Sequence, residues 1–382
     1  MRNIEDIRNE IDAIDEEIAS LYVKRLEISK EVAEAKRAAG APLADPARER
    51  EILLKTANRV GPEYEDGAAI LFTTLFDLSK ALQRKSLFGR GAVAREIEAA
   101  SANTPRDFPN KAVVACQGIE GAYSQLAASH FFKFPTILYF NTFDDVFSAV
   151  EKGLCRYGIL PIENSSAGSV TAVYDEMVRH NFRIVRAARR QVSHVLLARR
   201  GAKLEDIREV ASHTQALQQC SMFLAGLRDA KRAPAINTAV AARMVAQSGR
   251  NDIAAIASRE CAQIYGLDII AENILDVPSN FTRFICISKD LEIYGDSRKI
   301  SLMLSVPHKP GSLSGILAKF TSIGVNLTKL ESRPVPGRDF EFRFNFEFES
   351  DPGNEKAVDL LSELSQDPEI EGFTFLGAYA EV

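Results

Sequence analysis

The chain has 382 residues, and at about 150 residues per domain this length predicts two or three domains. Hydrophobic residues make up 46% and charged residues 26%, and the 22 glycines and 15 prolines are too few for a collagen-like or low-complexity chain. The formal net charge of −5 argues against a protein that coats nucleic acid or lies on a membrane surface. An anionic ligand must therefore be bound by locally placed cations.

Residues 1–89 are predicted to be entirely helical. Apolar residues from Ile4 to Val32 recur at alternating three- and four-residue intervals, the spacing of a long packed seam. This first helix is about 50 Å long, which is more than a domain of about 90 residues can cover by itself. We therefore expect a second chain along it. The expected boundaries are an end at Gly40, a second helix from Asp45-Pro46 to near Gly61, and a third from about Glu65 to Phe88.

Four polar side chains interrupt the apolar seam of these helices: Arg25, Lys36, Ser79 and Gln83. Because an unpaired buried cation is costly, we expect an anion to meet the two cations. The alternative is a structural ion pair with a carboxylate of the same segment, namely Glu27, Asp45 or Glu49. Arg8 lies on a different face of its helix and could reach such a site only from a partner chain.

The motifs that carry these residues are IRNEIDAID (7–15), VKRLEISKEVAEAK (23–36), ADPARERE (44–51) and LSKALQ (78–83). Together they resemble the all-helical, intertwined-dimer chorismate mutase domain. The resemblance implies that Arg8 of the other subunit, Arg25 and Ser79 hold the carboxylates of chorismate. It implies that Lys36 and Gln83 hydrogen-bond the ether oxygen as catalytic donors. The ring hydroxyl and its surroundings would be bound by Glu49 and the segment around Asp45 and Arg48.

The chemistry of this rearrangement fits the residue types. A Claisen rearrangement needs neither a nucleophile nor a proton transfer. It needs a folded dianion and donors aimed at an ether oxygen that gains negative charge. Residues 1–89 contain no histidine and no cysteine, which agrees with that requirement.

Residues 90–110 are predicted to be a linker with a helical start. In residues 111–290, short apolar runs alternate with helical patterns, which predicts an α/β domain with mostly parallel strands. Four segments stand out in it: GIEGAYS (118–124), PIENSSAGSV (161–170), SHTQAL (212–217) and NFTRF (280–284). Taken one at a time, the GxxG turn and a lone histidine are weak signals. His213 by itself fits a helix cap, and Thr282 fits a residue that caps a strand–loop junction.

Together the four segments resemble prephenate dehydratase, whose two α/β lobes are arranged like those of a periplasmic binding protein. The resemblance implies that Thr282 is catalytic, because a positioned hydrogen-bond donor helps hydroxide leave while aromatisation supplies the driving force. Arg283 would polarise Thr282 or hold a carboxylate. The expected substrate-binding residues are Ser124, Glu163, Asn164, Ser165, His213, Gln215, Thr282, Arg283 and Phe284.

Residues 299–382 are predicted to follow the βαββαβ order of ferredoxin-like folds, with strands 300–306, 325–333, 339–349 and 370–379 and helices 312–323 and 354–366. This segment resembles an ACT regulatory domain of the type that binds phenylalanine, which we expect at the interface of paired domains. Its motif Glu331-Ser332-Arg333-Pro334 matches the family, whereas Gly311-Ser312-Leu313-Ser314 has serines in place of small or apolar residues. Weaker inhibition or a response to tyrosine stays open. We expect deletion of residues 297–382 to leave a dehydratase that phenylalanine no longer inhibits.

The order of the three segments resembles the bifunctional enzymes that convert chorismate through prephenate to phenylpyruvate, with L-phenylalanine as effector and a homodimer or higher homo-oligomer as the assembly. One alternative is that residues 1–89 serve mainly as a dimerising and regulatory arm, and another is a ligand sensor without dehydratase chemistry. We expect no cofactor and no metal, because no such motif is present. The five well-separated cysteines, the charged start and the lack of long apolar stretches predict a cytoplasmic protein without disulfides or membrane spans.

Overall fold

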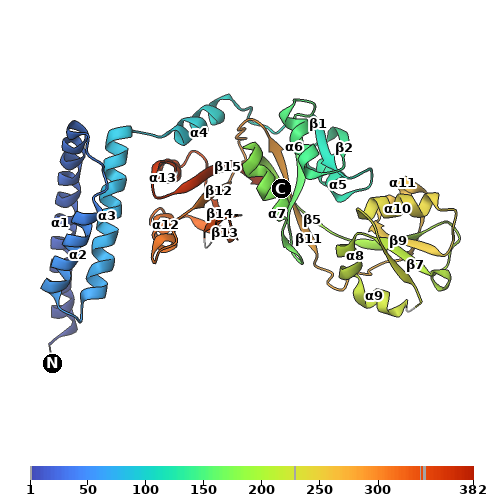
Figure 1. The fold of residues 1–382 in the computed structure, drawn as a ribbon, viewed down its shortest axis with the longest axis horizontal. Helices are drawn as coiled ribbons and strands as arrows, with labels where there is room; N and C mark the ends of the chain where they lie inside the picture. The colour runs from blue at the N-terminus through green and yellow to red at the C-terminus, as the bar shows by residue number, and fades with distance from the viewer. Residues whose placement is uncertain (1, 228, 336, 339–340) are drawn as a thin grey trace.

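The computed structural model describes residues 2–227, 229–335, 337–338 and 341–382. Figure 1 shows a helical domain at one end of the molecule and an α/β lobe at the other, with a second α/β lobe and the C-terminal domain between them. The helical domain consists of α1 (Ile4–Ala39), α2 (Pro46–Val60) and α3 (Glu65–Phe88). The predicted ends are confirmed: Gly40 takes the left-handed conformation after α1, and the Asp45 side chain accepts a hydrogen bond from the Arg48 N–H before α2.

The apolar seam of α1 is largely uncovered in the single chain. Its residues expose between 38% and 64% of their surface, and they are Ile4, Ile11, Ile14, Ile18, Leu21, Ile28 and Val32. The α1 positions that do pack inside the domain, such as the fully buried Ala33, lie on the side toward α3. A stripe of this length and exposure is what a partner chain would cover.

The segment predicted to be a linker does more than connect two domains. It forms α4 (Ala92–Asn103), whose residues Ala94, Ile97 and Ala100 are buried in the core of the C-terminal domain against α13 (Glu355–Gln366). The Gly91 N–H also donates to the Ser362 hydroxyl at 2.7 Å. The helical start is confirmed, but the segment is not a free tether, because an apolar residue every third position gives it a buried face.

The first α/β lobe is a mixed sheet in the order β5-β11-β3-β1-β2, with β4 beside β3. Helix α5 covers one face of it, and α6 and α7 cover the other. Its elements are β1 (Lys111–Gln117), α5 (Tyr123–Phe131), β2 (Phe134–Phe140), α6 (Phe143–Glu151), β3 (Tyr157–Asn164), β4 (Gly168–Ser169), α7 (Thr171–His180), β5 (Arg183–Gln191) and β11 (Phe281–Ser288). The prediction of mostly parallel strands is confirmed here, because β5, β3, β1 and β2 run in one direction, while β11 lies antiparallel between β3 and β5.

The second lobe is another mixed sheet, in the order β10-β6-β9-β7-β8. Its elements are β6 (His194–Ala198), η1 (Leu204–Asp206), β7 (Glu209–Ser212), α8 (Thr214–Gln219), α9 (Ser221–Gly226), β8 (Lys231–Pro234), α10 (Thr238–Gln247), β9 (Ile253–Ser258), α11 (Glu260–Tyr265) and β10 (Asp268–Ala271). The chain passes between the lobes twice, after β5 and before β11. Two crossings of this kind place a cleft between the lobes, as in binding proteins.

The C-terminal domain has the predicted βαββαβ order: β12 (Lys299–Ser305), α12 (Ser312–Ser322), β13 (Asn326–Pro334), β14 (Phe342–Glu349), α13 and β15 (Glu371–Glu381). Residues 339–340, where the third strand was expected to begin, lie outside the described residues. The strand order β13-β14-β12-β15 continues into the first lobe, because β15 pairs in parallel with β5. At this junction Gly377 has φ 143°, and a Cβ there would lie 2.2 Å from the Ile184 carbonyl oxygen, so only glycine fits.

This junction changes the expectation for a truncated chain. Met303, Leu376 and Tyr379 of the C-terminal domain are buried in the core of the first lobe. Deletion of residues 297–382 would remove part of that core as well as the edge partner of β5, so the truncated chain is not a clean test of regulation. The five cysteines are all buried and free. In the described part of the chain, none of the helices is long and apolar enough to cross a membrane.

Candidate active sites

The helical domain brings Arg25 of α1 and Ser79 of α3 together. Arg25 Nη1 donates to the Ser79 hydroxyl at 2.6 Å and to the Leu75 carbonyl at 2.9 Å, and its guanidinium lies 5.7 Å from the Phe76 ring centre. Partial burial lowers the pKa of Arg25. Among the described residues Arg25 has no ion-pair partner. A half-buried guanidinium held by neutral acceptors is a site that can take a carboxylate.

The other polar residues of the seam are only partly assembled. Gln83 is buried, 6% exposed, and its Oε1 has no hydrogen-bond partner. Lys36 donates to the Leu43 carbonyl at the turn after α1. Glu49 lies 3.4 Å from Lys80 Nζ, so it pairs with neither Arg25 nor Lys36. The structural ion pair considered as an alternative for these two cations is therefore not formed.

The remaining residues expected at this site lie at its edge. Asp45 is exposed and caps α2, and Arg48 pairs with Glu51 at 2.6 Å in solvent. Arg8 is exposed on α1 and is not joined to Arg25 or Ser79 by any contact in the described residues. The residues expected at this site are therefore not all brought together within one chain.

A pocket of about 460 Å³ lies between the two α/β lobes, a size that suits a small metabolite. Six residues expected from the sequence line it: Ser124, Asn164, His213, Gln215, Thr282 and Phe284. They come from α5, β3, the start of α8 and β11, so strands and helices of both lobes converge on one cavity. This agrees with the general position of ligand sites at the ends of strands.

Thr282 is held so that its hydroxyl can donate into this pocket. Asn164 lies opposite it in the β3–β11 pair and donates from Nδ2 to Thr282 Oγ1 at 2.9 Å. The same amide nitrogen donates to Asn280 Oδ1 at 2.9 Å, while Asn164 Oδ1 accepts from the N–H groups of Ser166 and Ala167, both at 3.0 Å. The Asn164 amide is thereby fixed in orientation. Since Thr282 Oγ1 already accepts, its hydrogen is available for a ligand.

The pocket offers an anion no lysine or arginine side chain among the described residues that line it. Instead the N-terminal ends of α5, α6, α7 and α10 reach it through Tyr123, Phe143, Val170 and Thr238. Helix N-termini present free N–H groups and a partial positive charge, so they can hold the carboxylates of a small dianion.

Comparison with known proteins gives the same division. The chorismate mutase type II model matches residues 7–84, and the prephenate dehydratase model matches residues 114–292. A bifunctional chorismate mutase/prephenate dehydratase of Aquifex aeolicus is 31% identical over 388 residues, which covers 99% of this chain and 98% of the relative. The chain belongs to the bifunctional chorismate mutase/prephenate dehydratase family. It is a chorismate mutase and a prephenate dehydratase.

Two further comparisons each cover about two thirds of the chain. An Arabidopsis thaliana protein named arogenate dehydratase/prephenate dehydratase 2 is 40% identical over 264 residues, covering 66% of this chain and 69% of that protein. The crystal structure of an Arthrobacter aurescens prephenate dehydratase in complex with L-Phe is 30% identical, with a TM-score of 0.63, covering 70% of this chain and 89% of that one. The predicted fold class is confirmed: a helical mutase domain, a two-lobed dehydratase domain and a C-terminal α/β region.

Three residues expected in the dehydratase pocket lie elsewhere. Arg283 points to the opposite side of β11 from Thr282, where its guanidinium pairs with Glu347 at 2.7 Å and Glu381 at 2.9 Å. Burial is the largest single influence on the pKa of Arg283 and lowers it, but Tyr379 and these two carboxylates together outweigh burial, so the pKa is raised. Adjacent residues of a strand face opposite ways, so Arg283 cannot join Thr282 in the pocket.

Glu163 and Ser165 also turn away from the dehydratase cavity. Glu163 pairs with Lys329 of β13 at 2.9 Å, and Ser165 accepts from the Phe281 N–H at 2.9 Å beside it. Glu163 thus contacts the C-terminal domain, and Ser165 supports the loop after β3.

His194 lines the dehydratase pocket and was missed by sequence reasoning. It is 3% exposed, burial lowers its pKa to about 4, and its Nδ1 lies 3.1 Å from the Tyr123 hydroxyl. It is therefore neutral near pH 7. His213, by contrast, accepts from the Gln215 N–H at 3.3 Å as the cap of α8, as its simpler interpretation predicted, and also lines the pocket.

The two motifs expected to bind an effector are separate within one chain. Ser312 and Leu313 line a pocket of about 350 Å³ beside Phe342 and Phe344, and the Ser312 hydroxyl is buried without a partner. Glu331 instead accepts from Ser169 Oγ at 2.6 Å in the dehydratase domain. Gly311 and Ser314 flank Ser312 and Leu313 in the first motif. The rest of the second motif follows Glu331 in β13 and consists of Ser332, Arg333 and Pro334.

Proposed function

We propose that chorismate rearranges at the group formed by Arg25, Lys36, Ser79 and Gln83, with Arg8 supplied by a second copy of the chain. Arg25 carries the proposal, because it is half-buried, held by two neutral acceptors and without a carboxylate partner in the described residues. Chorismate is a dianion whose carboxylates would complete it. Lys36 and Gln83 then stabilise the negative charge that develops on the ether oxygen.

A homodimer follows from the same site. The exposed apolar stripe on α1 needs a cover, and Arg8 needs to be brought to a site that its own chain does not reach. A second copy packed along α1 meets both needs. The test is equilibrium sedimentation of the full chain, in which a monomer at micromolar concentration would contradict the dimer.

We propose that Thr282 donates the hydrogen bond that helps hydroxide leave prephenate. In that step the bonds from the ring to the carboxylate and to the hydroxyl oxygen break. The electron pair of the first bond enters the ring as CO2 leaves, and the departing hydroxide takes up a proton to become water. Asn164 supports this role, because its amide fills an acceptor site of Oγ1 and leaves the hydrogen free for the pocket.

The hydroxyl role of Thr282 can be separated from its packing. Thr282→Ser keeps the donor and loses a methyl group, whereas Thr282→Val keeps the shape and loses the donor. We expect the serine variant to retain activity on prephenate and the valine variant to lose on the order of 100-fold or more. Equal loss in both would show that the methyl group matters instead. Arogenate should be assayed beside prephenate, since a 40% identical relative carries both names.

We propose that L-phenylalanine binds the C-terminal domain at an interface between two copies and inhibits the dehydratase. The support is that Ser312 has an unpartnered buried hydroxyl in its pocket, while Glu331 of the second motif contacts Ser169 of β4, the strand that pairs with the end of β3 that carries Asn164. Ser312→Val should therefore weaken phenylalanine binding in calorimetry and leave uninhibited dehydratase rates unchanged. Unchanged binding would place the effector elsewhere.

We also propose that the enzyme works in a reducing compartment such as the cytoplasm. The five cysteines are buried and free, which fits an environment that keeps thiols reduced. Titration of the denatured protein from cell extract should find five thiols.

A further inference from the structure

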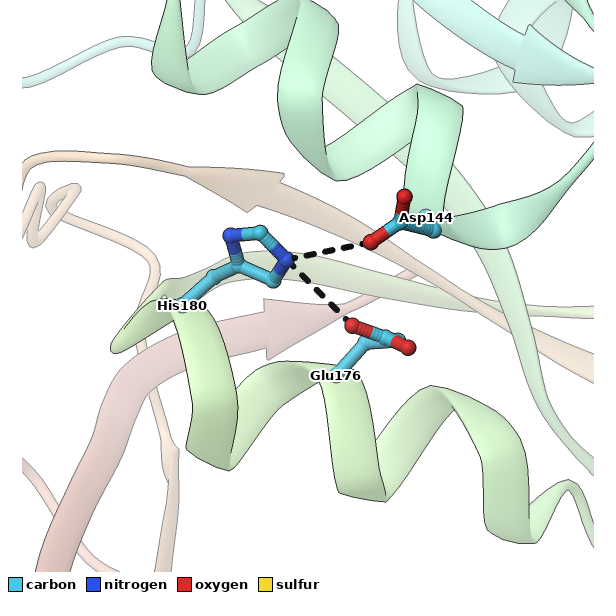
Figure 2. A group of neighbouring side chains, drawn as sticks. All are labelled: Asp144, Glu176 and His180. Carbon is cyan, nitrogen blue, oxygen red and sulfur yellow. Dashed lines mark ion pairs between the residues drawn. The ribbon is translucent and has the colours of Figure 1, made fainter.

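We propose that Asp144, Glu176 and His180 bind one divalent transition-metal ion, with Zn²⁺ as the best match, in the first lobe and outside the dehydratase pocket. Figure 2 shows the three side chains pointing toward one another between α6 and α7. Asp144 is in the first turn of α6, and Glu176 and His180 are four residues apart on α7, so they share one face of that helix. Their ligand atoms all lie within 4.8 Å of one another.

The orientation of His180 is the observation that points to a ligand. Its side chain is 10% exposed, and Nε2 has less than 1 Å² of accessible surface and no hydrogen-bond partner. Its other ring nitrogen, Nδ1, lies 3.3 Å from Glu151 Oε2, and the ring stacks on Phe147 with 5.4 Å between centres. The Glu151 carboxylate can accept a hydrogen bond from Nδ1–H, and in that tautomer Nε2 directs its lone pair toward Asp144 and Glu176. This is the arrangement that metal-binding histidines usually have.

The distances fit a small tetrahedral ion. Nε2 lies 3.5 Å from Asp144 Oδ1 and 3.3 Å from Glu176 Oε2. Zinc bonds to nitrogen and oxygen are about 2.1 Å long, so two ligands of a tetrahedral zinc are about 3.4 Å apart. Both observed separations match that edge, and a fourth position would be left for water. His180 is also in the last turn of α7, where the helix dipole favours a cation.

Arg179 is the competitor for the same two carboxylates. Its Nη1 lies 3.1 Å from Asp144 Oδ1 and 3.4 Å from Glu176 Oε2, so it supplies positive charge when no ion is bound. Its side chain is 66% exposed, and ion pairs of this kind contribute little stability. The guanidinium can therefore swing into solvent and make way for the metal. If the cluster were only a set of ion pairs, Arg179 would hold Asp144 and Glu176 together, and its removal would disrupt the cluster.

The ion would join two helices whose N-terminal ends reach the dehydratase pocket. Phe143 begins α6 and Val170 precedes α7, and both line that pocket. Because the ion binds the folded lobe and not the unfolded chain, it raises stability in proportion to the logarithm of its concentration. This site departs from our expectation of no metal, which considered motifs close in sequence and not residues on two helices.

The test uses the full-length chain, stripped of metal, titrated with Zn²⁺ in a calorimeter and checked by equilibrium dialysis. We expect one equivalent to bind and the melting temperature to rise with Zn²⁺. His180→Gln and Asp144→Asn should each weaken binding by at least about tenfold, as loss of a ligand does. The second variant alters a half-exposed residue, so it keeps the test valid if the first fails to fold. His130→Gln, at an exposed histidine of the same lobe, should bind like the unmodified chain.

Arg179→Ala decides between the metal site and a cluster of ion pairs. Loss of the competing guanidinium should tighten Zn²⁺ binding. Absence of a single zinc equivalent, full zinc binding by both His180→Gln and Asp144→Asn, or weaker binding in Arg179→Ala would each overturn the proposal. Co²⁺ gives an independent readout, because a tetrahedral ion with nitrogen and oxygen ligands should produce visible absorption that His180→Gln removes.

Discussion

The helical domain and the two-lobed domain build their sites in opposite ways. The dehydratase pocket is lined by both lobes of one chain, and its key hydroxyl is already held by Asn164. The mutase site has Arg25 and Ser79 in contact, but Arg8 remains apart and the apolar stripe on α1 is exposed. A short helical domain cannot enclose a ligand by itself, whereas two lobes can. In the proposed function, the mutase site therefore depends on a second chain, whereas the dehydratase pocket does not.

The largest expected effect confined to one region comes from Lys36→Ala. Removal of a preorganised donor to the ether oxygen should lower chorismate turnover by on the order of 100-fold or more. Activity on added prephenate should not change. Lys30→Ala, an exposed lysine on the same helix, is the matched control. A near-normal mutase rate in Lys36→Ala would remove Lys36 from the site.

A charge in the exposed stripe should separate the two activities by concentration. Ile14→Glu alters a residue that is 51% exposed in one chain, so the fold should tolerate it while the dimer weakens. We expect mutase activity to fall about tenfold at low protein concentration, where the weakened dimer dissociates, and to recover as concentration rises. A tenfold increase in the dimer dissociation constant corresponds to about 1.4 kcal/mol. Dehydratase activity should stay constant. Ser20→Glu, on another face of α1, should change neither, and a concentration-independent loss in Ile14→Glu would argue against a dimer.

Acid should destabilise the two-lobed domain through His194. Burial lowers its folded pKa to about 4 from an ordinary 6.5, so the unfolded chain takes up a proton first as pH falls. The stability that neutral His194 contributes is present above pH 6.5 and is lost between about pH 6.5 and 4. At pH 5.5 the loss should be on the order of 1 kcal/mol. Urea unfolding followed at pH 7.5 and 5.5 measures it, and His194→Gln should remove most of the difference. An unchanged pH dependence in that variant would assign it to other groups.

The smallest expected effect concerns the contact between the mutase helix and the C-terminal domain. Arg84 follows Gln83 on α3 and pairs with Asp367 at 3.0 Å, with both side chains largely buried. We propose that this contact couples phenylalanine binding at the C-terminal domain to the mutase. Arg84→Ala should then weaken the effect of phenylalanine on the mutase rate by about fivefold, at the low end of typical coupling energies, and leave inhibition of the dehydratase intact. Lys85→Ala breaks an exposed pair with Asp359 and should have little effect. Equal loss of both inhibitions in Arg84→Ala would point to a damaged effector site.

Local chemistry explains why the helix ends could be predicted and some contacts could not. Gly40, Asp45-Pro46 and Gly89 act through their own backbone preferences, so their positions mark the ends of α1, α2 and α3. The buried face of α4 was also visible in the spacing of Ala94, Ile97 and Ala100, but only its packing on α13 shows its purpose.

The side on which Arg283 lies could have been predicted, because it follows Thr282 in a strand and the two-residue period places it on the opposite face. Other features depend on which distant segments pair. His194 begins the buried run HVLLA and reaches the pocket only because the second lobe closes over it. The pairing of β15 with β5 joins residues almost two hundred positions apart and has no local signal.

The separation of the two activities can be tested by mixing two variants. Thr282→Ala should convert chorismate to prephenate and stop there, while Lys36→Ala should act on prephenate but form it slowly. Phenylpyruvate formed from chorismate should be low with either variant alone and rise strongly when both are present, since prephenate made by one can be used by the other. No increase in the mixture, or loss of mutase activity in Thr282→Ala, would contradict two independent sites in one chain.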